Sequence, residues 1–305
     1  MENINKLDRN RPLPVLPKKF VTANPAEADL LLARDGKAEA TIVFAPGAAD
    51  AAIDLEKHLR KITGANFNLM VDRGNMPEGN LILVGATRKT LSLGEGIFDT
   101  YPKGEGYTIR REGNVLMLVG NDDGEFKGTQ HAVTRFLEEA GCGWFTDDAL
   151  WQIVPQKATL AVKAVDMTVE PVISGRSISD VGETMTARWY LGGDSFAAGH
   201  GLWRWGGEGK YASHPEWFAL VKGSRDPGPV AWWQYCYTNE EFAQVVGNGV
   251  VDYFDKNPNV VSYSIASNDG WYEGWCECET CAAVGNQSDQ MLLFANRVAE
   301  IVAQK

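Results

Sequence analysis

The sequence predicts an α/β fold in which an N-terminal α/β accessory domain is followed by a partial, incomplete TIM-type (β/α) barrel. Three observations lead to this prediction. Strand and helix patterns alternate over the first half of the chain. The composition then changes near Pro171, and eight of the ten tryptophans fall between Trp189 and Trp275. A second series of strand and helix patterns follows, and alternation of this kind is typical of sheets that are covered by helices.

The first series of elements predicts a compact α/β unit. A short apolar run at residues 40–44 indicates a strand. Apolar residues at helical spacing then indicate a helix that Asp50 caps and Gly64 ends. The patterns that follow indicate a helix at residues 126–139 and strands at residues 81–84, 107–110, 115–119 and 159–162.

The second series of elements has the order expected of a barrel. Residues 173–179 and 260–265 have the composition of strands, and residues 239–255 have helical spacing of apolar side chains. Ser288 is a candidate N-cap for a final helix. A strand, a long loop, a helix and another strand follow one another in (β/α) barrels.

The length of the second part limits how much of a barrel the chain can hold. A full barrel takes about 250 residues, and 135 residues follow Glu170. We therefore expect a lead-in segment at residues 1–39, the accessory domain at residues 40–168 and the first part of a barrel at residues 169–305. A smaller, open α/β second domain is the alternative.

Composition and charge exclude several classes of partner. The formal net charge is −11, which disfavours nucleic acid and anionic membrane surfaces, because both attract clustered Lys and Arg. No apolar run approaches the roughly 20 residues that cross a bilayer, and no signal peptide is visible before Phe20. A neutral carbohydrate fits this charge.

A pair of carboxylates follows the expected strand at residues 260–265. Asp269 would lie at its carboxyl end, which is the active-site rim of a barrel, and burial there would raise the pKa of Asp269 and suit it to act as a general acid. Glu273 is the second carboxylate, and glycoside cleavage needs two such groups. The alternative is that Asn268, Asp269 and Gly270 form a plain turn.

Aromatic and polar residues nearby are candidates for substrate binding. Indole rings stack on sugar faces, although any one tryptophan can equally fill the core. Arg176 could bind sugar hydroxyls or the carboxylate of a uronic acid. The complete set of candidate binding residues is Arg176, His200, Trp203, Trp233, Asn268 and Trp271.

Four of the five cysteines could form one site. Cys276, Cys278 and Cys281 lie within six residues, and Cys236 could join them from the preceding loop. Four thiolates would make a closed structural zinc site, whereas catalysis calls for no cofactor. Disulfides and free thiols are the open alternatives, because no pairing can be read from spacing alone.

Several segments resemble a known family. The second half is similar to domain-of-unknown-function family 4838, which occurs in bacterial carbohydrate-degrading proteins, through His214-Pro-Glu-Trp-Phe-Ala-Leu-Val-Lys-Gly-Ser-Arg225, Cys236-Tyr-Thr-Asn239, Ser264-Ile-Ala-Ser-Asn-Asp-Gly270 and Cys276-Glu-Cys-Glu-Thr-Cys281. The first half resembles the N-terminal accessory domain of α-glucuronidases and β-hexosaminidases, through residues 52–64, 82–85, 106–109 and 136–144.

The resemblance implies a glycoside hydrolase-like protein with a TIM-type barrel that acts on or binds a poly- or oligosaccharide, with uronic-acid-containing glycans as one candidate class. It favours a secreted or periplasmic location. It also implies that the second catalytic carboxylate would come from later barrel strands. A non-catalytic glycan-binding or scaffold protein with a structural metal site at the cysteines is the alternative.

Overall fold

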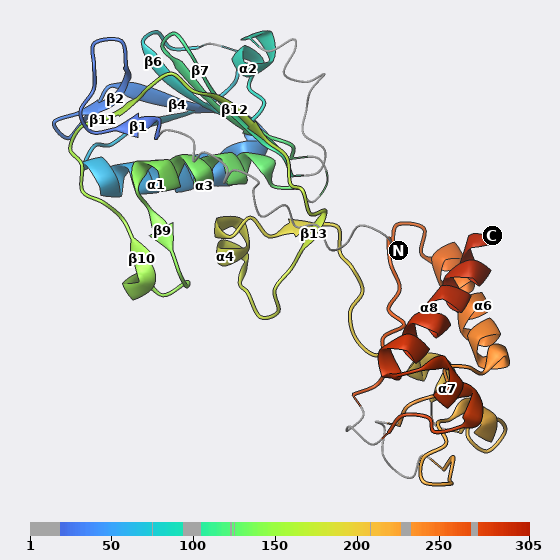
Figure 1. Ribbon diagram of the computed structural model, residues 1–305. Helices are drawn as coiled ribbons and strands as arrows, with labels where there is room; N and C mark the ends of the chain where they lie inside the picture. The colour runs from blue at the N-terminus through green and yellow to red at the C-terminus, as the bar shows by residue number, and fades with distance from the viewer. Residues whose placement is uncertain are drawn as a thin grey trace, which may run out of the picture. The chain divides into compact units, whose positions relative to one another are not determined.

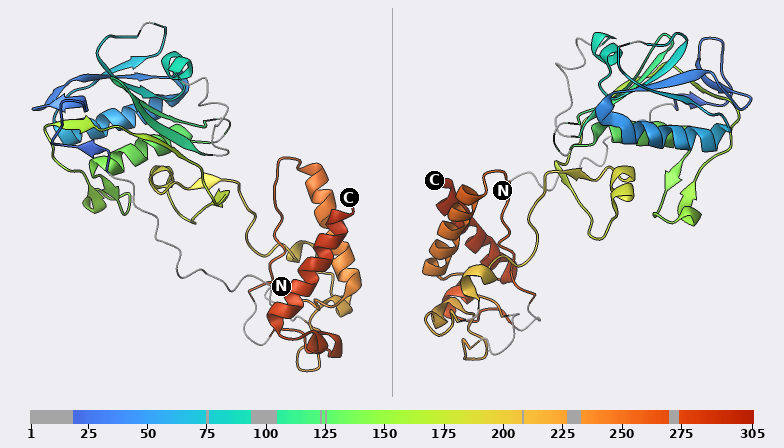
Figure 2. Two further views of the ribbon diagram at one scale, coloured as in Figure 1. Left: turned by 45° about the horizontal axis from the view of Figure 1, so that its top comes forward. Right: turned by 180° about the vertical axis from the view of Figure 1, so that it is seen from behind.

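The chain forms two compact units, one that extends to Gly193 and one that begins at Asp194. Figures 1 and 2 show both in a computed structural model, and each is described by itself. The structure describes residues 19–74, 76–93, 105–122, 124, 126–207, 209–226, 233–269 and 274–305.

The first unit is built on a six-stranded sheet in the order β12-β7-β8-β6-β4-β5. Its parallel strands are β4 (Ala40–Phe44), β5 (Asn68–Val71), β6 (Asn80–Val84) and β8 (Val115–Gly120). The antiparallel edge consists of β7 (Tyr107–Glu112) and β12 (Asp166–Val169). Two helices, α1 (Ala49–Thr63) and α3 (Gly128–Ala140), lie side by side against one face of this sheet (Figure 1).

Burial explains the central part of this sheet. β6 and β8 are almost entirely buried, and their sequences are continuous apolar runs, as expected for strands covered on both faces. On α1 the apolar residues Leu55, Leu59 and Ile62 point into the core. Gly64 ends this helix with φ of 76°, a left-handed conformation that glycine adopts without strain. The predicted strands and helices of this region are therefore confirmed, although Asp50 lies in the first turn of α1 rather than at its N-cap.

The segment expected as a lead-in contains strands of the first unit. β1 (Val21–Thr22), β2 (Leu30–Arg34) and β3 (Lys37–Ala38) form a second sheet with β11 (Leu160–Val162). A short hairpin joins β9 (Gly143–Trp144) to β10 (Gln152–Ile153). The remaining short elements before β12 are the helix α2 (Arg88–Leu93) and the 3-10 turns η1 (Pro46–Ala48) and η2 (Ala149–Trp151).

The first unit also continues past the predicted boundary at residue 168. β13 (Gly175–Arg176) pairs with β14 (Gly192–Gly193), and α4 (Glu183–Arg188) lies between them in sequence. Two ion pairs fasten this segment to the unit, because Arg176 pairs with Glu105 and Arg188 pairs with Asp54. The change in tryptophan density near Pro171 therefore precedes the end of the first compact unit.

The second unit is built around two long helices, α6 (Glu240–Lys256) and α8 (Gln287–Ala303). Both predicted helices are confirmed. Asn239 caps α6 by accepting a hydrogen bond from the backbone N–H of Phe242, and Asn286, rather than Ser288, caps α8. The shorter helical elements of this unit are α5 (Trp203–Gly206), η3 (Pro215–Trp217) and α7 (Glu279–Val284).

The expected barrel is not confirmed. Among the described residues of the second unit, residues 260–265 pair with no strand, and two isolated bridges occur, Phe218 with Tyr235 and Val221 with Ser224. The expected strand at residues 173–179 is reduced to β13. A β-branched sequence becomes a ladder strand only where neighbouring strands accept its hydrogen bonds, and residues 260–265 have side-chain partners instead.

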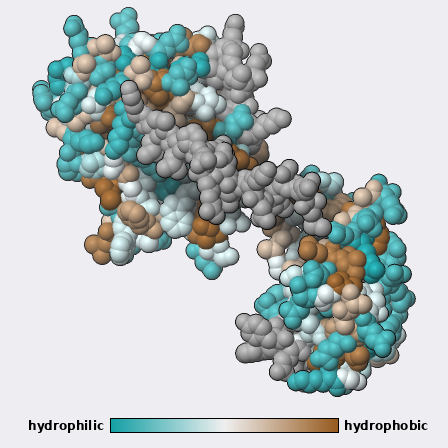
Figure 3. All heavy atoms as spheres, in the orientation of Figure 1, coloured by the Kyte–Doolittle hydropathy of each residue, from teal (hydrophilic) through white to brown (hydrophobic). Residues whose placement is uncertain are grey.

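The surface of both units is mostly hydrophilic on the face that Figure 3 shows, with smaller groups of hydrophobic side chains between. Among the described residues, no helix combines the length and the apolar character that a membrane span requires.

Candidate functional site

Two segments of the second unit, residues 197–201 and 262–267, lie side by side. The backbone N–H of Ala197 donates to Ser262 Oγ at 2.6 Å, and Ser264 Oγ donates to the carbonyl of Gly199 at 2.5 Å. A side chain at Gly201 would place its Cβ 1.8 Å from the carbonyl oxygen of Ser264. Glycine at position 201 therefore permits the close approach of the two segments.

The contact between these segments brings His200 to Asp269. His200 Nε2 lies 3.0 Å from Asp269 Oδ2, and His200 Nδ1 donates to the carbonyl of Ser267 at 2.6 Å. The Ser267 carbonyl raises the pKa of His200, partial burial opposes this, and the Asp269 carboxylate raises it further. The imidazole is thus held in one orientation with its cationic form favoured.

Asp269 does not have the environment that the sequence led us to expect. The expectation of a buried carboxyl group is wrong, because the Asp269 side chain is 74% exposed. The pair instead presents an imidazole and a carboxylate to solvent, a combination that can accept from and donate to neighbouring hydroxyl groups. Glu273, the expected second carboxylate, lies outside the described residues.

Asn268 positions the residue that follows it. Its Nδ2 donates to the carbonyl of Trp233 at 2.7 Å, and Gln234 Nε2 donates to the carbonyl of Asn268 at 2.5 Å. Tyr237 donates its hydroxyl to Gln234 Oε1 at 2.7 Å. The buried Asn268 therefore anchors the backbone before Asp269 to residues 233–237.

The expected tryptophans differ in how accessible they are. Trp203 is 64% exposed and lies three residues after His200. Trp233 is half-buried, and its Nε1 donates to the carbonyl of Ala219 at 3.2 Å. Trp271 lies outside the described residues. Of the two candidate tryptophans that the structure describes, Trp203 therefore has the ring that is more accessible to a ligand.

Arg176 is placed in the first unit, whereas His200 and Asp269 belong to the second. Its Nη2 donates to Glu105, its Nε to the carbonyl of Tyr190 at 2.7 Å and its Nη1 to the carbonyl of Ile173 at 2.7 Å. Each nitrogen of this guanidinium already has an acceptor within the chain. The pKa of Glu105 is nevertheless raised, because burial outweighs the nearby Arg176 charge.

Cys236, Cys276, Cys278 and Cys281 converge. Their four sulfur atoms all lie within 4.8 Å of one another, and none forms a disulfide. The pKa of Cys236 is lowered, because Cys276 and Cys281 donate hydrogen bonds to its sulfur, and the pKa of Cys276 is raised to about 11 by that same contact. The donor set is one that binds soft metal ions.

A second exposed imidazole–carboxylate pair was not anticipated from the sequence. His214 Nδ1 lies 3.2 Å from Glu216 Oε1, and the His214 ring stacks on Trp217 with centroids 3.9 Å apart. The sequence did contain a signal for this pair, because His214 and Glu216 are separated by a single residue and can meet within one turn. This pair provides a matched comparison for His200 and Asp269.

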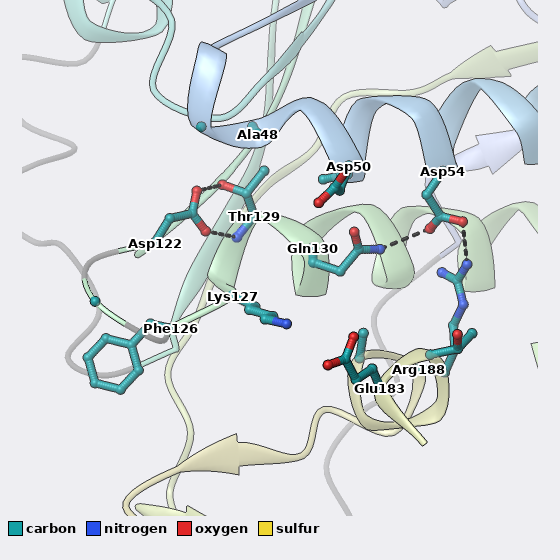
Figure 4. Close-up of a pocket in the computed structure, with 15 residues that line it drawn as sticks. Ala48, Asp50, Asp54, Asp122, Phe126, Lys127, Thr129, Gln130, Glu183 and Arg188 are labelled. Atoms are coloured by element: carbon teal, nitrogen blue, oxygen red, sulfur yellow. Dashed lines mark hydrogen bonds and ion pairs between the residues drawn. The ribbon is translucent and has the colours of Figure 1, made fainter. Parts of the chain in front are cut away.

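A cavity of about 450 Å³ lies in the first unit. Figure 4 shows it between the N-terminal parts of α1 and α3 and the helix α4, with Asp54 directed toward both Gln130 and Arg188. Asp122 in the same wall accepts from the backbone and the hydroxyl of Thr129. None of the residues that we expected to form the site lines this cavity.

Comparisons with known proteins give one family match. The model of a family described as Domain of unknown function (DUF4838) matches residues 147–305. No curated protein matches the sequence.

Two similar solved structures are glycoside hydrolases. One is a family GH115 4-O-methyl-α-glucuronidase, BtGH115A, with specificity for decorated arabinogalactans (12% identity, TM-score 0.44, 90% of this chain and 40% of that chain). The other is a GH20 exo-β-N-acetylglucosaminidase from Vibrio harveyi in complex with N-acetylglucosamine (16% identity, TM-score 0.29, 53% of this chain and 20% of that chain). The chain spans less than half the length of either enzyme.

Proposed function

The chain belongs to the DUF4838 family, and we propose that it is a carbohydrate-active protein of glycoside hydrolase type whose second unit binds a poly- or oligosaccharide. The observation that carries this proposal is the pair formed by the half-buried His200 and the exposed Asp269, whose atoms Nε2 and Oδ2 lie 3.0 Å apart. Carboxylate and imidazole groups at a surface match the donors and acceptors of sugar hydroxyls.

We include Trp203 in the proposed surface as its apolar contact. It is an exposed indole close in sequence to His200, and an indole face offers a large and rigid area to the C–H face of a sugar ring. The net charge of −11 disfavours an anionic ligand at long range. We name His200, Trp203 and Asp269 together the sugar surface.

Neutral sugars are the better fit than uronic acids. Arg176, which was expected to bind sugar hydroxyls or a uronate carboxylate, has an acceptor within the first unit for each of its guanidinium nitrogens. The cation of the sugar surface, His200, already faces the Asp269 carboxylate. We therefore expect hydroxyl groups of a neutral glycan to be recognised.

The binding test is a glycan array with the intact chain, followed by calorimetric titration of the best oligosaccharide. Asp269→Asn replaces a charged acceptor and should weaken binding about tenfold, because charge-assisted hydrogen bonds exceed neutral ones by about 1.4 kcal/mol. Trp203→Ala should weaken it at least as much, since ring stacking is lost.

Two variants serve as matched controls. Glu216→Gln neutralises the other exposed imidazole–carboxylate pair of the same unit, and Trp151→Ala removes a comparably exposed tryptophan from the first unit. Both should leave the affinity within twofold of the original. Equal affinity of Asp269→Asn and Glu216→Gln would refute the sugar surface. A preference for uronate oligosaccharides would refute the neutral-sugar part alone.

Hydrolysis with Asp269 as general acid is the second candidate function. It is favoured by one observation: His200 Nε2, whose cationic form is favoured, lies 3.0 Å from Asp269 Oδ2 and could supply that carboxylate with a proton. In that case Asp269→Asn should abolish release of reducing sugar while leaving binding within twofold. Glu273 is the proposed partner carboxylate, and Glu273→Gln should have the same effect.

A further inference from the structure

The four clustered cysteines come from two separate parts of the second unit. Cys276 and Cys278 precede α7, Cys281 lies inside it, and Cys236 lies about 40 residues earlier in the chain. Cys236, Cys276 and Cys281 are buried and Cys278 is half-buried. Convergence of the distant Cys236 on the other three thiols is not expected from hydrophobic burial alone, because its thiol could be buried separately.

Two of the six distances between the sulfur atoms equal the edge of a tetrahedral metal site, and all six are within 4.8 Å. Cys236 Sγ lies 3.8 Å from both Cys278 Sγ and Cys281 Sγ. A tetrahedron with metal–sulfur bonds of about 2.3 Å has an edge of about 3.8 Å. A disulfide would require about 2.05 Å between two sulfurs, so the four atoms are spaced for a shared ligand and not for bonding in pairs.

Hydrogen-bond donors surround the sulfur atoms. The backbone N–H of Leu220 donates to Cys276 Sγ at 3.3 Å. Thr238 Oγ1 lies 3.1 Å from Cys281 Sγ and 3.6 Å from Cys236 Sγ, so its hydroxyl can donate to either sulfur. Such donors stabilise thiolates, which are the form in which cysteine binds metals.

We propose that Cys236, Cys276, Cys278 and Cys281 together bind one Zn²⁺ ion as a closed, structural site. Four thiolates fill a tetrahedral coordination shell and leave no position for a substrate or a catalytic water. Each thiol releases its proton to solvent on binding. Iron also binds to four thiolates, and a metal analysis distinguishes bound iron from bound zinc.

The site would hold together segments that have little other support. α7 has only six residues, and so short a helix is not stable without tertiary contacts. Gln290 of α8 donates to the carbonyl of Cys281 at 3.2 Å, which links the site to the long helices. On the other side, Gln234 connects residues near Cys236 to Asn268. Zinc would thereby stabilise the backbone that carries Asp269.

The test is the metal content of the full chain, purified without a metal-binding tag and measured by plasma mass spectrometry. We expect one zinc per chain, and its loss in Cys278→Ser. The control is Cys142→Ala, which removes the fifth cysteine from the first unit and should keep one zinc. Iron in place of zinc, or metal retained in Cys278→Ser, would overturn the proposal.

A second measurement does not depend on how the variant folds. The metal is removed from the unchanged chain with a chelator under reducing conditions, and Co²⁺ is then titrated in. One equivalent should produce the intense visible absorption and the sulfur-to-cobalt charge-transfer bands of tetrahedral thiolate coordination, and zinc should abolish them. Absence of these bands, or disulfides among the four cysteines in the protein as purified, would overturn the assignment.

Discussion

The ion pair between Asp54 and Arg188 lets the stability of the first unit be predicted quantitatively. Arg188 Nη2 lies 2.6 Å from Asp54 Oδ1, and the side chains are 4% and 21% exposed respectively. His58 Nδ1 lies 3.1 Å from the same oxygen, and Gln130 donates to the other at 2.9 Å. Burial opposes ionisation, but hydrogen bonds from His58 and the charge of Arg188 outweigh it and lower the pKa of Asp54 to about 2.

The pKa shift sets the expected magnitude. The shift from 3.8 to about 2 corresponds to about 2–3 kcal/mol of folding free energy, at about 1.4 kcal/mol for each unit. The same interaction can be gauged from Arg188, because loss of the countercharge costs about 3–5 kcal/mol for a fully buried pair and less here, where Asp54 is partly exposed. We expect Asp54→Asn to lower the free energy of unfolding of the first unit by about 2–3 kcal/mol at pH 7.

The sign of the pH dependence follows from the same shift. The folded-state pKa is depressed, so the stabilisation is fully present above the unfolded value of 3.8 and is lost as the pH falls toward 2. The difference between Asp54→Asn and the original chain should therefore shrink within that interval.

Hydrogen exchange measured by mass spectrometry in increasing urea is the assay, with peptides from α1 and α3 as reporters. It reads the opening of the first unit alone, which matters because two units need not unfold together. Glu56→Gln on the same helix is the control. Glu56 pairs with the exposed Arg60 at 3.8 Å, and such pairs contribute below about 1 kcal/mol. Equal destabilisation by the two variants would refute the reasoning.

Three further predictions concern acid sensitivity and the sugar surface. Burial lowers the pKa of His131 from 6.5 to about 4, so the first unit should lose about 3 kcal/mol between these pH values as the unfolded chain takes up a proton; His131→Leu should abolish this loss in exchange measurements. Gly201→Ala should reduce carbohydrate affinity at least tenfold in calorimetry, because its methyl group would clash with Ser264, whereas Gly182→Ala meets open space and should not. Carbohydrate affinity should fall as the pH rises through the raised pKa of His200, which deprotonates and weakens its pairing with Asp269; an unchanged affinity across that range would contradict the role of the cation.

The first unit was largely predictable, because its elements carry local signals. The apolar run at 40–44 is the strand β4, and Leu55, Leu59 and Ile62 form the buried face of α1. Short strands such as β1 and β3 escaped prediction, since two residues leave no periodic pattern. The packing of residues 170–193 onto this unit depends on pairs such as Glu105 with Arg176, which spacing does not encode.

The second unit was predicted in its helices and less well in its extended segments. The caps and spacing of α6 and α8 are local features. Residues 260–265 have the composition of a strand, but strand formation depends on partners elsewhere in the chain. The side chains of Ser262 and Ser264 bond to residues 197–199 instead.

The candidate site was predicted by residue type better than by environment. Spacing placed His200, Asn268 and Asp269 on loops, but it could not show that Asp269 is exposed or that His200 is its partner. His200 and Asp269 are brought together by the close approach of Gly201 to Ser264, which is a tertiary contact. Clustering of Cys276, Cys278 and Cys281 was visible in the sequence, and Cys236 was named there as a candidate to join them; the structure brings all four sulfur atoms within 4.8 Å of one another.

A crystal structure of the chain with a bound oligosaccharide from the glycan screen tests the central claim most directly. Our account predicts sugar hydroxyls within hydrogen-bond distance of Asp269 or His200 and a ring face against Trp203. A sugar bound elsewhere, for example in the cavity of the first unit lined by Asp50 and Arg188, with Asp269 and His200 free of contact, would contradict it.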